Sequence, residues 1–149
     1  MKNKERIVGG LGSGKTTLIR EKLIPLLKDY VVLDFCDEYR LHVKNSSNAI
    51  YFNGLVGWLL KGEVISAINK LSDDATVIID NAHLLYFPTS QYSFVQDRGF
   101  EWLMDLLKNK HSVLVFQNTK QIANKGIYRN YNLRHIDHFN NSKIIKQLK

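Results

Sequence analysis

A glycine-rich run near the start of the chain restricts the fold more than any other feature. Residues 6–8 form a short apolar segment, which is followed directly by Gly9-Gly10-Leu11-Gly12-Ser13-Gly14 and then by Lys15-Thr16-Thr17. Closely spaced glycines let successive backbone N–H groups turn inward around an anion, and a lysine adds a positive charge beside them. The pattern predicts a strand, a phosphate-binding loop and a helix, in that order.

The spacing within this run is that of a nucleotide-binding loop. Gly9, Gly14, Lys15 and Thr16 satisfy G-x-x-x-x-G-K-[ST], in which the lysine reaches the β and γ phosphates and the hydroxyl binds Mg²⁺. The positive end of the following helix also favours phosphate. The sequence therefore predicts a site for ATP and Mg²⁺. Its nucleotide-binding residues are predicted to be Gly9, Gly10, Gly12, Ser13, Gly14, Lys15, Thr16 and Thr17, with Lys15 also catalytic.

A second polar site follows the apolar strand predicted over residues 75–79. Asp80 ends that strand and would hold Mg²⁺ through water, with Thr16 as the direct ligand. In nucleotide-hydrolysing folds a glutamate usually comes next and activates the attacking water, but this chain has Asn81. An amide can orient a water yet cannot accept its proton at neutral pH. Either the chain does not hydrolyse nucleotide or its base lies elsewhere, and the role of His83 stays open.

A replacement base is predicted at the end of another strand. Residues 30–36 read as a buried strand that runs into Asp37 and Glu38. Because parallel strands end at one edge of a sheet, we expect Glu38 to act as general base. The alternative is that Glu38 only solvates a loop or pairs with Arg40. Glu101 lies inside a predicted helix and is a poorer candidate, whereas Gln117, at the end of a strand over residues 112–117, could act as a polar sensor.

Strands alternate with helices along the chain, which predicts an α/β fold with a mainly parallel sheet covered on both faces. Helices are predicted over residues 54–71 and about 100–110, the second capped by Asp97. The first helix should falter near Ile24, since Pro25 disfavours the α conformation before it. Residues 84–97 are turn-rich, and residues 133–139 form a weaker last strand. A length of 149 residues predicts one domain over residues 1–149.

Charge and composition add two expectations about surroundings. The net charge is +7, and residues 117–149 carry seven basic residues against one acid, a net +6. Such a region can bind nucleic acid by releasing counterions, or it can simply keep the chain soluble. The start of the chain fits neither a signal peptide nor a membrane span, so a cytoplasmic location is predicted. The single cysteine, Cys36, lies in an apolar run and is expected to be a buried, inert thiol.

Four stretches together resemble the FtsK/HerA superfamily of P-loop ATPases, in a minimal form. They are residues 32–39 (Val-Leu-Asp-Phe-Cys-Asp-Glu-Tyr), residues 77–85 (Val-Ile-Ile-Asp-Asn-Ala-His-Leu-Leu), residues 113–117 ending in Gln117, and residues 133–139. The resemblance implies a RecA-like sheet and a ring of subunits, with ATP between them and DNA through the centre. It implies an arginine acting in trans, for which Arg98 and Arg129 are candidates, and DNA-backbone contacts from Lys120, Lys125 and Arg129. A viral member would work in the host cytoplasm.

The function expected from these features is that of an ATP-hydrolysing subunit of a DNA-translocation or DNA-packaging motor. A small-molecule nucleotide or nucleoside kinase has the same loop and a similar size, but no compact lid with clustered arginines is evident in this sequence. A non-hydrolysing, nucleotide-dependent binding module is the third interpretation, and Asn81 favours it. The basic region fits the motor and the module better than the kinase.

Overall fold

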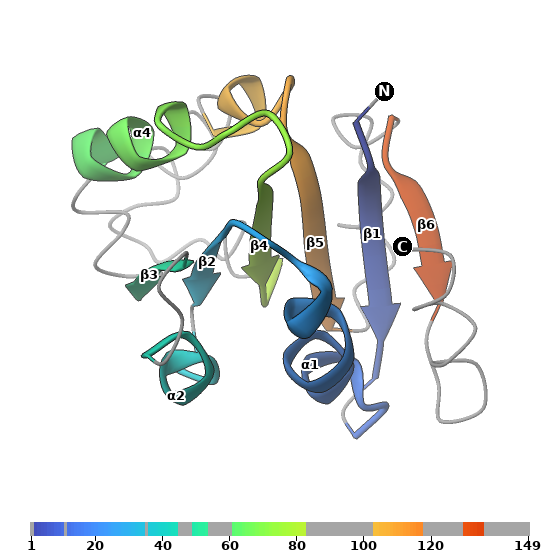
Figure 1. Cartoon of the computed structure of the whole chain (residues 1–149). Coiled ribbons are helices and arrows are strands. Elements are labelled where there is room, and N and C mark those ends of the chain that lie inside the picture. Colours follow the sequence, from blue (N-terminus) through green and yellow to red (C-terminus); the bar gives the residue numbers. More distant parts are fainter. Residues whose placement is uncertain are drawn as a thin grey trace, which may run out of the picture.

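The central feature of the fold is a parallel sheet. The computed structural model describes residues 2–10, 12–34, 36–44, 49–53, 61–82, 103–117 and 130–135. Within these ranges six strands lie in the order β3-β2-β4-β5-β1-β6, and every neighbouring pair is parallel (Figure 1). Their bounds are β1 Lys4–Gly9, β2 Tyr30–Asp34, β3 Ala49–Asn53, β4 Thr76–Asp80, β5 His111–Gln117 and β6 Asn132–His135. The predicted α/β fold with a parallel sheet is confirmed.

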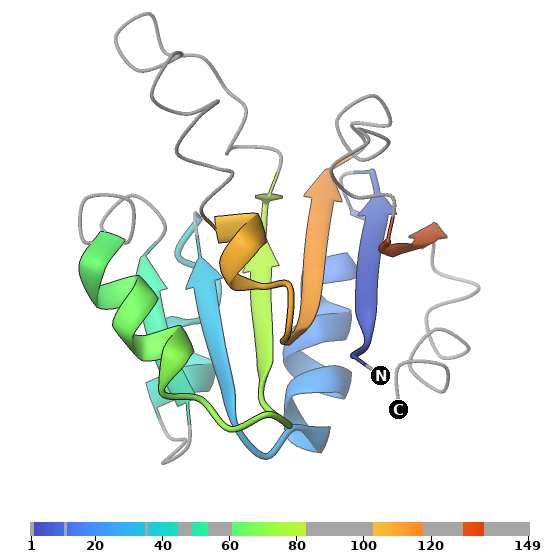
Figure 2. The ribbon, with the colours of Figure 1, turned by 90° about the horizontal axis from the view of Figure 1, so that it is seen from above.

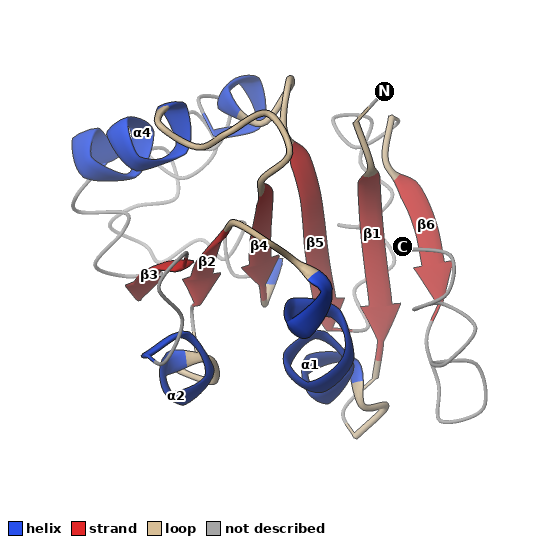
Figure 3. Ribbon diagram, in the orientation of Figure 1, coloured by secondary structure: helices blue, strands red, loops and turns tan. Residues whose placement is uncertain are grey.

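Helices cover both faces of this sheet. On one face lie α1 (Lys15–Leu18), its continuation through a π-helical segment (Ile19–Leu23) and a 3₁₀ turn (Ile24–Leu26), and α2 (Arg40–Lys44) (Figures 1 and 3). On the other face lie α4 (Lys61–Asn69) and a single helical turn at residues 103–106 (Figure 2). Loops at the strand ends are therefore the places where polar side chains can gather.

The two faces of the sheet pack into two separate cores because side chains alternate along each strand. Val31 and Leu33 of β2 join the core beneath α4, while Tyr30 and Val32 join the core beneath α1. The neighbouring strand β4 alternates in the same way, and every residue of both strands is buried. Continuous apolar runs of this kind are typical of central parallel strands.

The helix after the glycine-rich loop changes its geometry along its length. The expected break near Ile24 appears as a switch from the π-helical segment to the 3₁₀ turn that contains Pro25, and the chain becomes extended at Leu27. Apolar pairs at residues 18–19 and 23–24 recur after five residues and all pack on the sheet. That spacing matches π-type i→i+5 hydrogen bonding, of which the Ile24 N–H to Ile19 O bond is an example.

Two elements of the fold were not predicted, and some predictions fall outside the described residues. The edge strand β3 and the short helix α2 lie within residues 40–53, for which no helix or strand was predicted. The predicted helical residues 54–60, the turn-rich residues 84–97 with Asp97, and residues 136–139 of the last strand lie outside the description. Among the described helices, none is both long and apolar enough to cross a membrane.

Candidate active site

The carboxyl ends of four strands bring the predicted site residues to one edge of the sheet. β1 ends at Gly9, level with Gln117 at the end of β5, and β2 ends at Asp34, level with Asp80 at the end of β4. β5 lies between β1 and β4. The glycine-rich loop and Asp80 are therefore separated by one strand, and the end of that strand, Gln117, lies between them.

The glycine-rich loop has the backbone shape that its sequence predicts. Gly12 has φ +73° and Gly14 has φ +88°, a left-handed region in which a side chain is strained. The Ser13 N–H donates to Gly10 O at 3.2 Å, and the Lys15 ammonium donates to the same carbonyl at 3.3 Å. Lys15 is only 8% exposed. The ammonium group of Lys15 therefore lies against the backbone of the loop.

One polar atom in the loop is left without a partner. Ser13 Oγ is buried and makes no hydrogen bond with the residues that the structure describes. A buried hydroxyl without a hydrogen bond is costly, and a ligand oxygen would satisfy it. Together with the left-handed glycines and the lysine, this atom makes the loop a chemical fit for a phosphate group.

Thr16 and Asp80 meet although they are far apart in the sequence. Thr16 lies in the first turn of α1, and its Oγ1 donates to Asp80 Oδ2 at 2.7 Å. A hydroxyl and a carboxylate are oxygen ligands of the kind that Mg²⁺ takes, usually together with water and substrate phosphates. The pair fits the predicted metal site, with Thr16 next to the loop and Asp80 at the strand end.

Asp80 is fully buried, and the hydrogen bonds to it from the described residues come from neutral groups. Oδ2 accepts from Thr16 and from the hydroxyl of Tyr39, each at 2.7 Å, and Oδ1 accepts from the Asn81 N–H at 2.7 Å. Burial raises the pKa of Asp80, and the bonds from Tyr39, Thr16 and Asn81 and the charge of Lys15 work against that rise. Asp80 is thus a carboxylate with little solvent around it, held in one orientation by three donors.

Glu38 lies beside Asn81. Asn81 Nδ2 donates to Glu38 Oε1 at 3.3 Å, between residues 43 positions apart in the sequence. Asn81 has φ +55°, a conformation that asparagine tolerates better than most residues do. The amide that replaces the expected glutamate therefore points its donor at a carboxylate from the neighbouring strand's turn. Arg40, the alternative partner considered for Glu38, bonds Asp37 through its Nε at 3.0 Å.

The turn that carries Glu38 is tied to two strands. The Tyr39 N–H donates to Asp34 Oδ2 at 2.9 Å, and Tyr51 of β3 contacts Asp34 Oδ2 at 3.0 Å and Asp37 Oδ1 at 2.6 Å through its hydroxyl. The hydrogen bond from Tyr51 is the main effect that lowers the pKa of Asp37. Asp34, Tyr39 and Tyr51 were not predicted as site residues. The run Ile-Tyr-Phe at residues 50–52 is a strand signal that could have placed Tyr51.

A further contact joins this turn to the helix after the loop. Arg20, in the π-helical segment, donates from Nη1 to the main-chain oxygen of Glu38 at 3.1 Å. Its Nε is buried without a hydrogen-bond partner among the described residues. The segment that begins at the glycine-rich loop therefore touches the residue predicted as base.

Cys36 differs from its prediction. The strand β2 ends at Asp34, so Cys36 lies in the following turn and is exposed rather than buried. Partial burial and the nearby charge of Glu38 raise the pKa of its thiol.

The remaining predicted residues are placed only in part. Thr17 is exposed in the first turn of α1. Gln117 is placed by its main chain at the end of β5. The other candidates lie outside the described residues: His83, Arg98, Glu101, Lys120, Lys125 and Arg129, with most of the basic region 117–149.

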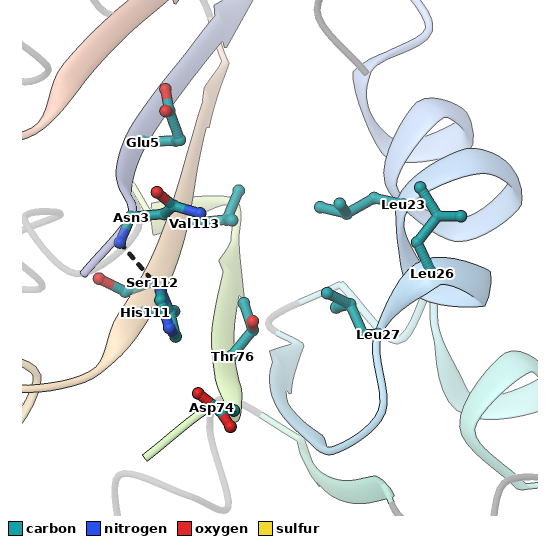
Figure 4. A pocket seen from close by; sticks show the side chains of 10 residues that line it. All are labelled: Asn3, Glu5, Leu23, Leu26, Leu27, Asp74, Thr76, His111, Ser112 and Val113. Atoms are coloured by element: carbon teal, nitrogen blue, oxygen red, sulfur yellow. Dashed lines mark hydrogen bonds between the residues drawn. The ribbon is translucent and has the colours of Figure 1, made fainter. Parts of the chain in front are cut away.

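A pocket of about 380 Å³ lies at the opposite, amino-terminal end of the strands. Three leucines from the end of the first helical segment form one wall, facing polar residues at the starts of β1, β4 and β5 (Figure 4). On the polar side of the pocket, His111 accepts a hydrogen bond from the Asn3 N–H at 2.9 Å. This pocket does not include the glycine-rich loop, Glu38 or Asp80.

Known proteins give no direct assignment of this site. No protein-family model matches the chain, and no curated protein sequence matches it.

Proposed function

We propose that the protein binds ATP at the glycine-rich loop and hydrolyses it with Glu38 as general base. The observation that carries this proposal is the 3.3 Å contact between Glu38 Oε1 and Asn81 Nδ2. It puts a carboxylate next to the position where the proton acceptor usually stands. The 2.7 Å contact between Thr16 and Asp80 supports the accompanying metal site.

Each residue has a part in the proposed reaction. The loop N–H groups and Lys15 would bind the β and γ phosphate oxygens, and Thr16 and Asp80 would hold Mg²⁺, which neutralises charge on those phosphates. Asn81 would orient the attacking water by a hydrogen bond. Glu38 would take one proton from that water as its oxygen bonds to the γ phosphorus and the bond to the β-phosphate oxygen breaks, giving ADP and phosphate.

We further propose that hydrolysis serves DNA translocation or packaging by a ring of these subunits. Support for this comes from the resemblance to FtsK/HerA ATPases and from the net +6 of residues 117–149. Contacts to the DNA backbone would come from Lys120, Lys125 and Arg129, and an arginine of a neighbouring subunit would complete each site. Gln117 would sense the γ phosphate.

Steady-state hydrolysis by the purified protein tests both parts. With Mg²⁺ and ATP we expect slow phosphate release that increases when double-stranded DNA is added. Glu38→Gln should abolish release while ATP binding persists, since the amide keeps the shape but cannot accept a proton. Glu63→Gln, in an exposed residue of α4, is the matched control and should hydrolyse like the wild type.

The other interpretations predict different outcomes of the same assay. ADP formation that requires a nucleoside or nucleotide acceptor would indicate a kinase. ATP binding without turnover, with or without DNA, would indicate a binding module. Turnover that DNA never stimulates would count against the motor, and unchanged turnover in Glu38→Gln would reject Glu38 as base.

A further inference from the structure

We propose that Tyr39 is a positioning residue, whose hydroxyl fixes Glu38 at the distance from β4 that hydrolysis needs. This inference rests on the proposed function of Glu38. Tyr39 follows Glu38 directly, is completely buried, and contacts the ends of both β2 and β4.

The main chain of Tyr39 sets one end of the turn. Its N–H donates to Asp34 Oδ2 at 2.9 Å, so the residue after Glu38 is anchored to the last residue of β2. The Arg20 contact to Glu38 O at 3.1 Å holds the turn from the side of the first helical segment. Neither contact reaches β4, the strand that carries Asp80 and precedes Asn81.

The Tyr39 hydroxyl supplies the tie to β4. It donates to Asp80 Oδ2 at 2.7 Å, while the ring packs in the core beneath α1 with Val43 and Ile78. This 2.7 Å bond and the longer 3.3 Å contact between Asn81 and Glu38 both link the turn after β2 to the end of β4. The short bond from Tyr39 to the buried carboxylate of Asp80 therefore fixes how far Glu38 lies from Asn81.

Removing only the hydroxyl separates positioning from packing. Tyr39→Phe keeps the ring in the core but lets the turn drift from β4, and a displacement of the catalytic group lowers the rate of the chemical step. We expect kcat for ATP to fall about tenfold, with KM changing less than about twofold, because the loop that binds the phosphates is untouched. Because the Tyr39 hydroxyl also bonds Asp80, which would hold Mg²⁺, the rates are compared at saturating Mg²⁺.

The double variant tests whether Tyr39 acts through Glu38. Glu38→Asp keeps a carboxylate but shortens the side chain, so a reduced but measurable rate should remain. Adding Tyr39→Phe to Glu38→Asp should lower kcat by clearly less than about tenfold, since residues that work as one unit are not additive. Tyr131→Phe is the matched control: it removes a buried tyrosine hydroxyl, bonded to Ser112 Oγ at 2.7 Å, that does not touch the Glu38 turn. Its kcat should equal that of the wild type.

Amide hydrogen exchange of residues 36–39 gives a measurement that does not depend on turnover. It should speed up in Tyr39→Phe and stay unchanged in Tyr131→Phe. A wild-type kcat in Tyr39→Phe, a change confined to KM, or an additive loss in the double variant would overturn the positioning role alone. A wild-type protein that hydrolyses no ATP would overturn the proposed function, and this inference with it.

Discussion

The substitution Asn81→Asp tests the contact between Asn81 and Glu38 through protein stability, without any assay of function. The change keeps the shape of the side chain but replaces the amide that donates to Glu38 Oε1 at 3.3 Å by a second carboxylate. Asn81 is 7% exposed, so water screens the new charge poorly. Aspartate also tolerates the left-handed backbone at φ +55°, so no new backbone strain is introduced.

The cost follows from Coulomb's law. Two unit charges about 4 Å apart repel by about 4 kcal/mol at an effective dielectric constant of about 20. Because Glu38 is only half-buried and can swing outward, we expect the free energy of unfolding at neutral pH to fall by about 2–4 kcal/mol. That is a large fraction of the roughly 5–15 kcal/mol that stabilises a typical domain.

Urea unfolding followed by circular dichroism measures this loss of stability. Repeating the measurement at several pH values tests whether charge repulsion causes it. Repulsion raises the folded-state pKa of the carboxyl pair, so full stability is present below the unfolded value of about 4 and is lost as pH rises. The difference between variant and wild type should therefore shrink towards zero as pH falls to about 4.

Rescue and control variants isolate the contact. Adding Glu38→Gln to Asn81→Asp restores an amide–carboxylate bond in reverse and should recover most of the loss. Asn132→Asp is the matched control, because Asn132 Nδ2 also lies 3.3 Å from a carboxylate, that of Glu5, but Arg134 bonds the same carboxylate at 3.0 Å. It should cost under about 1 kcal/mol. Equal stability of Asn81→Asp and wild type at neutral pH, or no recovery from Glu38→Gln, would refute the proximity of Glu38 to β4.

Two further predictions concern the loop and the alkaline limit of stability. Gly14→Ala should lower the free energy of unfolding by about 1–2 kcal/mol and weaken ATP binding, because φ is +88° at this position. Gly62→Ala in α4 is the control, because an added Cβ there meets nothing within 4 Å. It should instead raise the free energy of unfolding by about 0.5–1 kcal/mol. Thermal unfolding and a titration with an ATP analogue measure both, and equal effects of the two substitutions would contradict the role of the left-handed backbone. Burial raises the pKa of Tyr131 to about 12, so the stability that this hydroxyl contributes is full below about pH 10 and is lost as pH rises through about 12. Tyr131→Phe should reduce the alkaline fall in the free energy of unfolding by about 1.4 kcal/mol per pH unit, and an unchanged slope would contradict this.

The strands β1, β2, β4 and β5 could be predicted from the sequence, whereas β3 and α2 were missed. The four strands with continuous apolar runs, β1, β2, β4 and β5, lie within two residues of their predicted bounds. α2 has five residues, basic mixed with apolar, which is too short a run for a helical period to emerge, and the Ile-Tyr-Phe run of β3 is a strand signal only three residues long. β3 is an edge strand with half-buried side chains, which weakens its apolar signal further.

Some residues of the candidate site could be found from local sequence motifs, whereas others depend on the tertiary fold. Motif spacing places Lys15 and Thr16, and the polar end of an apolar strand places Asp80, because these signals are local. The nearness of Glu38 to Asn81 follows once β2 and β4 are known to end at the same edge. Tyr39 could not be assigned, because a tyrosine after an acidic turn carries no pattern that tells a buried hydrogen-bonded ring from an exposed one.

The position of Asn81 can now be explained by the order of the strands. β2 and β4 are neighbours, and Asp34 lies level with Asp80, so the turn after β2 must pass beside the residue after Asp80. A glutamate at position 81 and the carboxylate of Glu38 would then repel each other across a poorly hydrated gap. An amide donor at position 81 removes that repulsion and binds the carboxylate instead. In this chain the asparagine therefore allows the carboxylate of Glu38, from the turn after the neighbouring strand, to lie beside it. Placing a glutamate at position 81 without removing Glu38 should destabilise the fold.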